Sequence, residues 1–283
     1  MSHRRLLIPV LAVCALVAFA TAATANHSWG PYHWARQSNP FTVKLGDNCT
    51  STWDPYLAEA SSDWTASSVL NTTIVAGGTR PKNCRATDGR VEVCNARYGN
   101  NGWLGIAQIW ITGGEHITQS IVKLNDTYHD TSPYNQPAWR RNVMCQEVGH
   151  AFGLDHQDEN FNNGNLGTCM DYTSDPDGPP SNEHPNSHDY AQLETIYAHL
   201  DSTTTVKSIV GRAQGGMPPA MGEIDFAGPA QWGKLIGLSR DGGQAVFELD
   251  FDHGNKVVTF VTWNQEVARD LASWAERGQI FEK

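Results

Sequence analysis

Hydrophobic and polar positions along the chain follow two periods, one typical of strands and one typical of helices. Alternating or short apolar runs bounded by turn residues predict strands at residues 41–45, 69–75, 103–111, 117–124, 234–237, 244–251 and 256–263. Helices are predicted at residues 54–67, 137–154, 187–200 and 264–277. The order of strand, helix and then several strands before the next long helix predicts a mixed α/β (α+β) sheet.

The N-terminus has the layout of a secretory signal peptide. Arg4 and Arg5 precede an apolar run at residues 6–20, and small residues follow as far as Ala25. We expect cleavage after Ala25 or Ala22, and hence a secreted protein with no membrane contact after cleavage. A retained membrane anchor is the alternative.

Composition divides the rest of the chain in two. Residues 202–222 are rich in Thr, Gly and Pro, which predicts a linker. The predicted organisation is a signal peptide at 1–25, a main domain at 26–201, this linker, and a small β-rich C-terminal module at 223–283. The residues of the C-terminal module indicate no chemistry.

Composition and charge exclude several classes of protein. With 283 residues, 18% of them charged and 40% hydrophobic, the chain is neither disordered nor a bundle of membrane helices. Its formal net charge is −10 and it has no long Lys/Arg run, which argues against a nucleic-acid partner. Removal of residues 1–25 takes away two arginines and no acid, so that 18 basic residues face 30 acidic ones.

Cleavage also removes Cys14 and leaves five cysteines, an odd number that cannot all pair within the chain in an oxidising compartment. Cys84 and Cys94 flank a turn that contains Asp88-Gly89, so a disulfide across a hairpin is predicted there. The other three are Cys49, Cys145 and Cys169.

The most informative chemistry lies in residues 146–156. On a helix, Gln146 and His150 lie one turn apart on one face, with Glu147 beside them. Gly153 can adopt a left-handed conformation and end the helix, so that the chain turns back and His156 meets His150. Two imidazoles with an acid one turn away can hold Zn²⁺ and activate its water.

This segment resembles the signature of the metzincin metalloendopeptidases (the matrixin and astacin type), H-E-x-x-H-x-x-G-x-x-H followed by a Met-turn. The acid, the second histidine, the glycine and the third histidine match Glu147, His150, Gly153 and His156. Residues 169–172, Cys-Met-Asp-Tyr, are similar to the Met-turn. The resemblance covers the main domain and implies a metzincin-like mixed twisted sheet with an active-site helix.

The resemblance also implies a secreted zinc endopeptidase that acts on a peptide or protein substrate. Gln146, His150 and His156 are then the metal ligands. Glu147 is the general base, which takes a proton from the zinc-bound water and passes it to the leaving amine. Tyr172 is the second catalytic candidate, as a contact to the metal or the oxyanion; the alternative is a core tyrosine.

Three further features follow from the resemblance. Met170 would form an apolar floor beneath the metal, and the substrate would lie along residues 103–108 as the edge strand of the sheet. Since the helix and the Met-turn lie close in this fold, a Cys145–Cys169 disulfide would join them. The alternatives for Cys145 are a buried thiol or a substitute ligand, although one residue of displacement turns it about 100° away from the ligand face. Cys49 is then the leftover thiol, buried or linked to a partner.

The chain departs from the family at the first ligand histidine, because that position is Gln146. An amide oxygen is a weaker donor to Zn²⁺ than an imidazole nitrogen. Two hypotheses follow. Either the three residues hold zinc loosely and the enzyme works, or the protein is a catalytically impaired member that binds peptide or protein without cleaving it. A structural secreted protein without metal would leave the signature unexplained.

Other candidate ligands are less specific. His129 or His188 could replace the absent first ligand, but these histidines, like His116 and His184, have polar neighbours in the sequence and are expected at the surface. Oxygen-rich side chains that could hold Ca²⁺ surround the third histidine; with no EF-hand spacing, a solvated loop is the alternative. They are Asp155, Asp158, Glu159 and residues 162–165.

Overall fold

The computed structural model describes residues 27–158, 163–206, 217–223, 226 and 228–277. The predicted signal peptide lies outside this set, as do Glu159, Asn162 and part of the predicted linker. Within these ranges, no helix has both the length and the apolar character that crossing a membrane requires.

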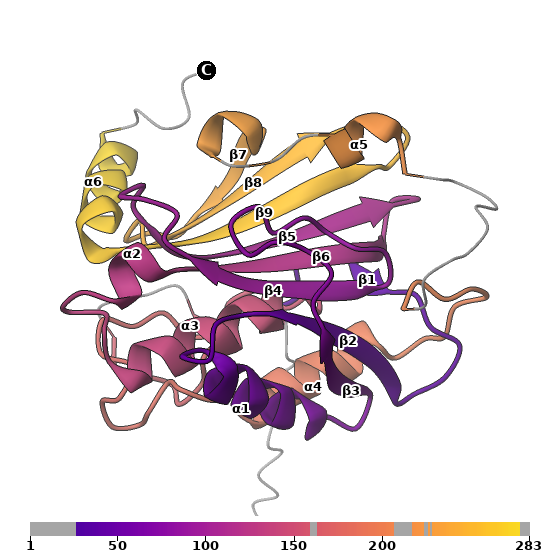
Figure 1. Cartoon of the computed structure of the whole chain (residues 1–283), viewed down its shortest axis with the longest axis horizontal. Coiled ribbons are helices and arrows are strands. Elements are labelled where there is room, and N and C mark those ends of the chain that lie inside the picture. Colours follow the sequence, from indigo (N-terminus) through magenta and orange to yellow (C-terminus); the bar gives the residue numbers. More distant parts are fainter. Residues whose placement is uncertain (1–26, 159–162, 207–216, 224–225, 227, 278–283) are drawn as a thin grey trace, which may run out of the picture.

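The described strands form one nine-stranded mixed sheet (Figure 1), which confirms the predicted mixed α/β (α+β) class. The strands that pair in parallel are β1 (His33–Trp34), β2 (Phe41–Asn48), β3 (Leu70–Ala76), β4 (Arg90–Ala96) and β6 (His116–Asn125). β5 (Trp103–Thr112) pairs antiparallel with β6. The order across the sheet is β3-β2-β4-β6-β5-β9-β8-β7, and β1 pairs with β6.

The three C-terminal strands continue this sheet. They are β7 (Lys234–Leu238), β8 (Gln244–Asp250) and β9 (Lys256–Trp263). β9 pairs antiparallel with β5 along its length, as the yellow and purple arrows of Figure 1 show. β5 is therefore an interior strand, and the prediction that residues 103–108 form the edge of the sheet is wrong. The physical reason is that both strands are apolar and buried on both faces, so that each hides the other's backbone.

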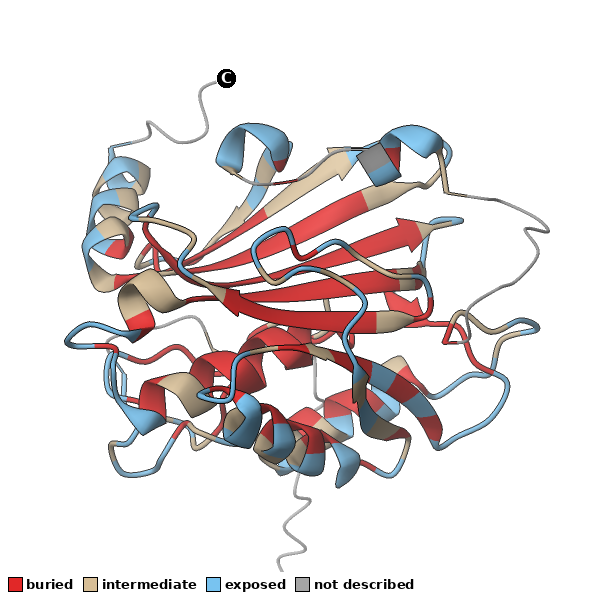
Figure 2. Cartoon of the chain, in the orientation of Figure 1, coloured by how far each residue is buried: buried red, intermediate tan, exposed pale blue. Residues whose placement is uncertain are grey.

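Helices α1 (Asp54–Thr65), α3 (Pro137–His150) and α4 (Ser187–Ile196) lie on one side of the sheet (Figure 1). The short helix α2 (Asp126–His129) lies between β6 and α3, α5 (Pro219–Glu223) lies between α4 and β7, and α6 (Gln265–Glu276) follows β9. α3 is buried along most of its length (Figure 2), because it lies between the sheet and α1. It ends at His150, four residues earlier than predicted, and Gly153 adopts the predicted left-handed conformation with φ of 93°.

Two apolar cores cover the two faces of the sheet. Alternate residues of β5 point into different cores, Ala107 and Ile109 into one and Ile106 and Trp110 into the other. The core on the helix side includes Trp34, Trp53, Trp64 and Phe152. The second core includes Trp103, Trp232, Val261 and Phe226.

Both predicted disulfides are present. Cys84 pairs with Cys94 and Cys145 pairs with Cys169, while Cys49 remains a thiol. The first bridge does not cross a hairpin, as the sequence suggested. Cys84 precedes β4, and both neighbours of β4 run parallel to it.

His129 is not a surface residue, so that prediction is wrong. Its side chain is fully buried and meets the ring of Trp53 edge-on, with 4.9 Å between centroids. Burial, helped by the charge of Arg140, lowers the pKa of His129 to about 3. The imidazole is therefore neutral in the folded protein at every pH at which the protein would be handled.

The low pKa of His129 predicts a pH-dependent stability. An unfolded histidine titrates near pH 6.5. The contribution of the neutral ring is therefore complete above that pH and is lost progressively between pH 6.5 and about 3. His129→Phe should flatten this part of the profile by up to about 1.4 kcal/mol per pH unit. Urea unfolding of both proteins between pH 7.5 and about 4.5 measures the two slopes, and parallel slopes would contradict the prediction.

Candidate functional site

The candidate site lies where α3 passes beneath β5. Three of its side chains, Gln146, Glu147 and His150, come from the last turn and a half of α3 and are almost inaccessible to solvent. The helix and the strand approach so closely that only glycine fits at position 105. A Cβ atom there would lie 2.5 Å from Glu147 Oε1.

The structure brings His150 and His156 together, as the sequence predicts. Their Nε2 atoms are 2.9 Å apart and their rings are stacked with 4.8 Å between centroids. His150 Nδ1 lies 2.8 Å from the carbonyl oxygen of Leu154. Because that oxygen can only accept, the proton of His150 is on Nδ1, and the lone pair on Nε2 faces His156.

Gln146 and Glu147 are linked through a hydroxyl group. Thr262 Oγ1 lies 2.8 Å from Gln146 Oε1 and 2.7 Å from Glu147 Oε1, and the amide nitrogen of Gln146 donates to the carbonyl of Cys169 at 2.9 Å. A hydroxyl carries one proton, so Thr262 can donate to only one of the two oxygens at a time. The other oxygen of Glu147, Oε2, has no hydrogen-bond partner in the part of the chain that the structure describes.

Burial shifts all the titratable groups here toward their neutral forms. It raises the pKa of Glu147 to about 8, against a smaller lowering by the hydrogen bond with Thr262. It lowers the pKa of His150 to about 4 and that of His156 well below its usual value. Both imidazoles are thus neutral at pH 7, which is the form that binds a metal ion.

The turn at residues 169–172 packs against the helix. Met170 is fully buried, and a Cβ atom on Gly149 would lie 2.6 Å from its sulfur. The ring of Tyr172 lies 5.3 Å from that of His156. The Cys145–Cys169 disulfide joins the turn to α3. Tyr172 therefore lies beside His156, and Met170 packs against α3 at Gly149.

Strands β8 and β9 close the site from the other side, which sequence reasoning did not foresee. The amide nitrogen of Gln244 donates to His150 Nε2 at 3.0 Å. The ring of Phe260 is stacked flat on that of His150, with 4.6 Å between centroids. Gly243 lies so close to Tyr172 that a Cβ atom would come within 2.4 Å of its hydroxyl oxygen. No local sequence pattern predicts these contacts, because they arise from the pairing of strands that are far apart in the sequence.

The described residues provide no further strong ligand for this site. No third His, Cys, Asp or Glu group in them joins His150 and His156 at metal-binding distance. His188 stacks on His27, and His129 contacts Trp53, so neither replaces the absent histidine. Asp155 and Asp158 likewise belong to no group of three His, Cys, Asp or Glu ligands within the described ranges. A metal ion would have to rely on two imidazoles and the amide oxygen of Gln146.

The chain was compared with protein-family models, curated protein sequences and solved structures. No protein-family model and no curated protein sequence matches the chain. Two solved structures of myroilysin are similar to it, with TM-scores of 0.34 and 0.32 at 10% and 12% identity. Both similarities cover 58% of this chain, and they cover 96% and 86% of the myroilysin chains. TM-scores this low support no conclusion about fold or function.

The contact between α3 and Met170 predicts the effect of a methyl group. Gly149→Ala would place Cβ 2.6 Å from the sulfur of Met170 and 2.7 Å from the ring of Trp64. We expect a loss of about 1–3 kcal/mol in the free energy of unfolding. Exposed helical glycines ordinarily gain about 1 kcal/mol from the same change, so the sign is diagnostic. Gly164→Ala, in a loop where the new Cβ meets nothing within 4 Å, is the control for adding a methyl group without a clash. A gain in stability for Gly149→Ala would contradict the described packing.

Proposed function

We propose that the protein is a secreted zinc-dependent endopeptidase. The observation that carries the proposal is the convergence of the Nε2 atoms of His150 and His156, 2.9 Å apart, beside the fully buried carboxyl group of Glu147. Neutral paired imidazoles with an adjacent acid suit a hydrolytic metal site. The two disulfides and the predicted signal peptide support the extracellular location.

Each residue of the site has a role in this proposal. His150, His156 and Gln146 would hold the metal ion. A bound zinc ion would polarise the scissile carbonyl and acidify a water molecule. Glu147 would take and return the proton in its ionised form, since its Oε2 is not engaged by the described residues. Burial raises its pKa to about 8, so this form is the minor one at pH 7 and grows with pH. Tyr172, beside His156, would orient the substrate carbonyl.

In this conformation β8 and β9 occupy the space that a substrate needs. β9 uses the hydrogen-bonding groups of β5 that an extended peptide would use, and Gln244 occupies the lone pair of His150. The proposed activity therefore requires that these strands move away from α3. The closed conformation is then a resting state of the enzyme.

A second function, binding of peptide or protein without cleavage, is favoured by one observation. The amide of Gln146 is engaged at both ends, by Thr262 and by the Cys169 carbonyl. A metal ion would have to displace Thr262 or use the second lone pair of the amide oxygen, which Thr262 already polarises. A catalytically impaired protein would keep the fold and lose the binding of the metal ion.

Zinc content and casein cleavage by the purified full chain separate the two functions. For the enzyme, the His150→Ala/His156→Ala double variant should lose one zinc ion relative to wild type. Glu147→Gln should keep that ion and cleave at least about a hundredfold more slowly, because a general base contributes about 10²–10⁴-fold. For the impaired protein, the wild type neither holds this zinc ion nor cleaves, and Gln146→His gains both.

The contact of Gln244 with His150 predicts a gain in metal affinity. Gln244→Ala removes a hydrogen bond that zinc must otherwise displace, and one such bond is worth about 0.5–1.5 kcal/mol. We expect zinc to bind at the histidine pair about three- to tenfold more tightly. Competition with a chromophoric chelator measures this affinity. Gln136→Ala is the matched control, because this exposed glutamine before α3 donates to the carbonyl of Pro133 and not to the site. Equal affinity in wild type and Gln244→Ala would show that β8 does not restrict the metal site.

A further inference from the structure

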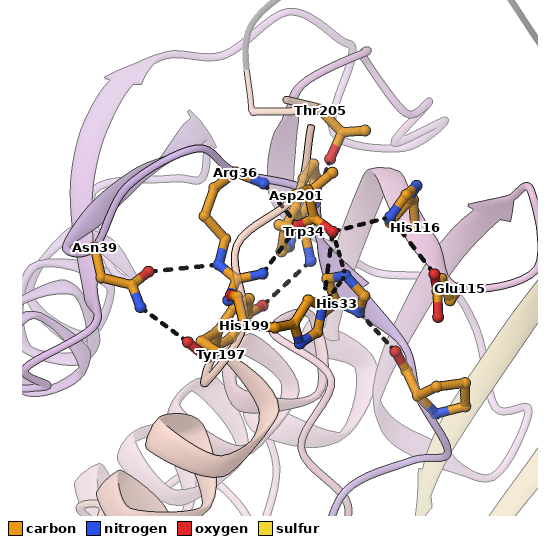
Figure 3. A network of polar contacts seen from close by, with 12 residues as sticks. His33, Trp34, Arg36, Asn39, Glu115, His116, Tyr197, His199, Asp201 and Thr205 are labelled. Carbon is orange, nitrogen blue, oxygen red and sulfur yellow. Dashed lines mark hydrogen bonds and ion pairs between the residues drawn. The ribbon is translucent and has the colours of Figure 1, made fainter. Parts of the chain in front are cut away.

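A second cluster of histidines lies away from α3, at the end of the sheet where β1 meets β6 (Figure 3). His33 belongs to β1 and His116 begins β6, and the two residues are directly opposite each other in the parallel pairing. His199 and Asp201 come from the segment that follows α4. In Figure 3 the three imidazoles gather around the carboxyl group of Asp201.

Four distances between ligand atoms of this cluster are close to the edge of a zinc tetrahedron. Asp201 Oδ1 lies 3.4 Å from His33 Nε2, 3.4 Å from His116 Nε2 and 3.6 Å from His199 Nε2. The Nε2 atoms of His33 and His199 are 3.2 Å apart. Ligands that bind zinc tetrahedrally at about 2.0–2.1 Å lie about 3.3–3.4 Å from one another. One ligand atom each of His33, His116 and Asp201 lie within 4.8 Å of one another, so these three groups can reach the same ion. His199 lies outside this set of three and would reach the ion only after its exposed side chain rotates toward His116.

Neighbouring groups orient two of these ligands. His33 Nδ1 donates to the carbonyl of Pro31 at 2.7 Å, which leaves the lone pair of Nε2 directed into the cluster. Asp201 Oδ2 accepts from the backbone nitrogen and the guanidinium group of Arg36, at 3.1 and 2.9 Å, so that Oδ1 remains for the histidines. Such outer contacts are typical of metal sites, where they fix the tautomer and the orientation of each ligand.

We propose that His33, His116 and Asp201 form a structural zinc site, in which His199 becomes the fourth ligand by rotation of its exposed side chain. Three imidazoles and one carboxylate complete the four-coordinate shell that structural zinc prefers and leave no open position for water. The ion would join three segments that are far apart in the sequence: the N-terminal strand, the start of β6 and the segment after α4. Its function is to hold the N-terminal strand and that segment on the sheet, independently of any peptidase activity.

Zinc retention by the full chain tests this site separately from the one on α3. The His150→Ala/His156→Ala variant removes the histidine pair and should still retain about one zinc ion per chain after gel filtration, since four ligands close one site. In that background, His116→Ala and His199→Ala should each weaken binding at least about tenfold. Neither substitution should disturb the fold, because the two side chains are 29% and 55% exposed. His253→Ala, at an exposed turn, is the control and should retain zinc.

Two further readouts guard against misfolding. Cobalt in place of zinc should give the visible absorption of a tetrahedral complex in the histidine-pair variant, and His199→Ala should abolish it. Zinc should also raise the melting temperature of that variant and of its His253→Ala derivative but not of His199→Ala. Absence of bound zinc and of the cobalt spectrum in a folded histidine-pair variant would overturn the proposal. So would unchanged affinity after replacement of both His116 and His199.

Discussion

The antiparallel pairing of β9 with β5 is the contact on which the candidate site depends. It makes β5 an interior strand and places Phe260 and Thr262 over the last turn of α3. β8 pairs antiparallel with β9, and this pairing brings Gln244 to His150. The complete burial of Glu147 is a consequence of this cover, and so is the rise of its pKa to about 8.

The same pairing satisfies backbone groups that would otherwise be exposed. A free β5 would offer a row of unpaired N–H and C=O groups to any extended chain. A substrate that binds by strand addition uses those groups, so β9 and such a peptide exclude each other. The energy that stabilises the closed sheet therefore opposes substrate binding directly. Any activity at α3 depends on how often this pairing opens.

Much of the fold could be predicted because its signals are local. Helix α3 begins at Pro137 and the chain turns at Gly153, so the meeting of His150 and His156 follows from spacing alone. The Cys84–Cys94 disulfide could be predicted from cysteine spacing, and the Cys145–Cys169 disulfide from the resemblance to the metzincin fold. The parallel placement of β4, the partner of β5 and the role of Thr262 could not. They depend on which distant strands pair, and an apolar run carries no information about its partner.

The two histidine clusters differ in a way that bears on their chemistry. At α3 two imidazoles converge and the third candidate donor, Gln146, is an uncharged amide held by Thr262. An ion there would keep positions open to water or to a carbonyl group, which is a requirement for hydrolysis and also a cause of weak binding. The cluster around Asp201 has three donors within reach of one ion and a fourth, His199, beside them. Metal bound there would be held tightly and be unreactive, so total zinc content alone says nothing about catalysis.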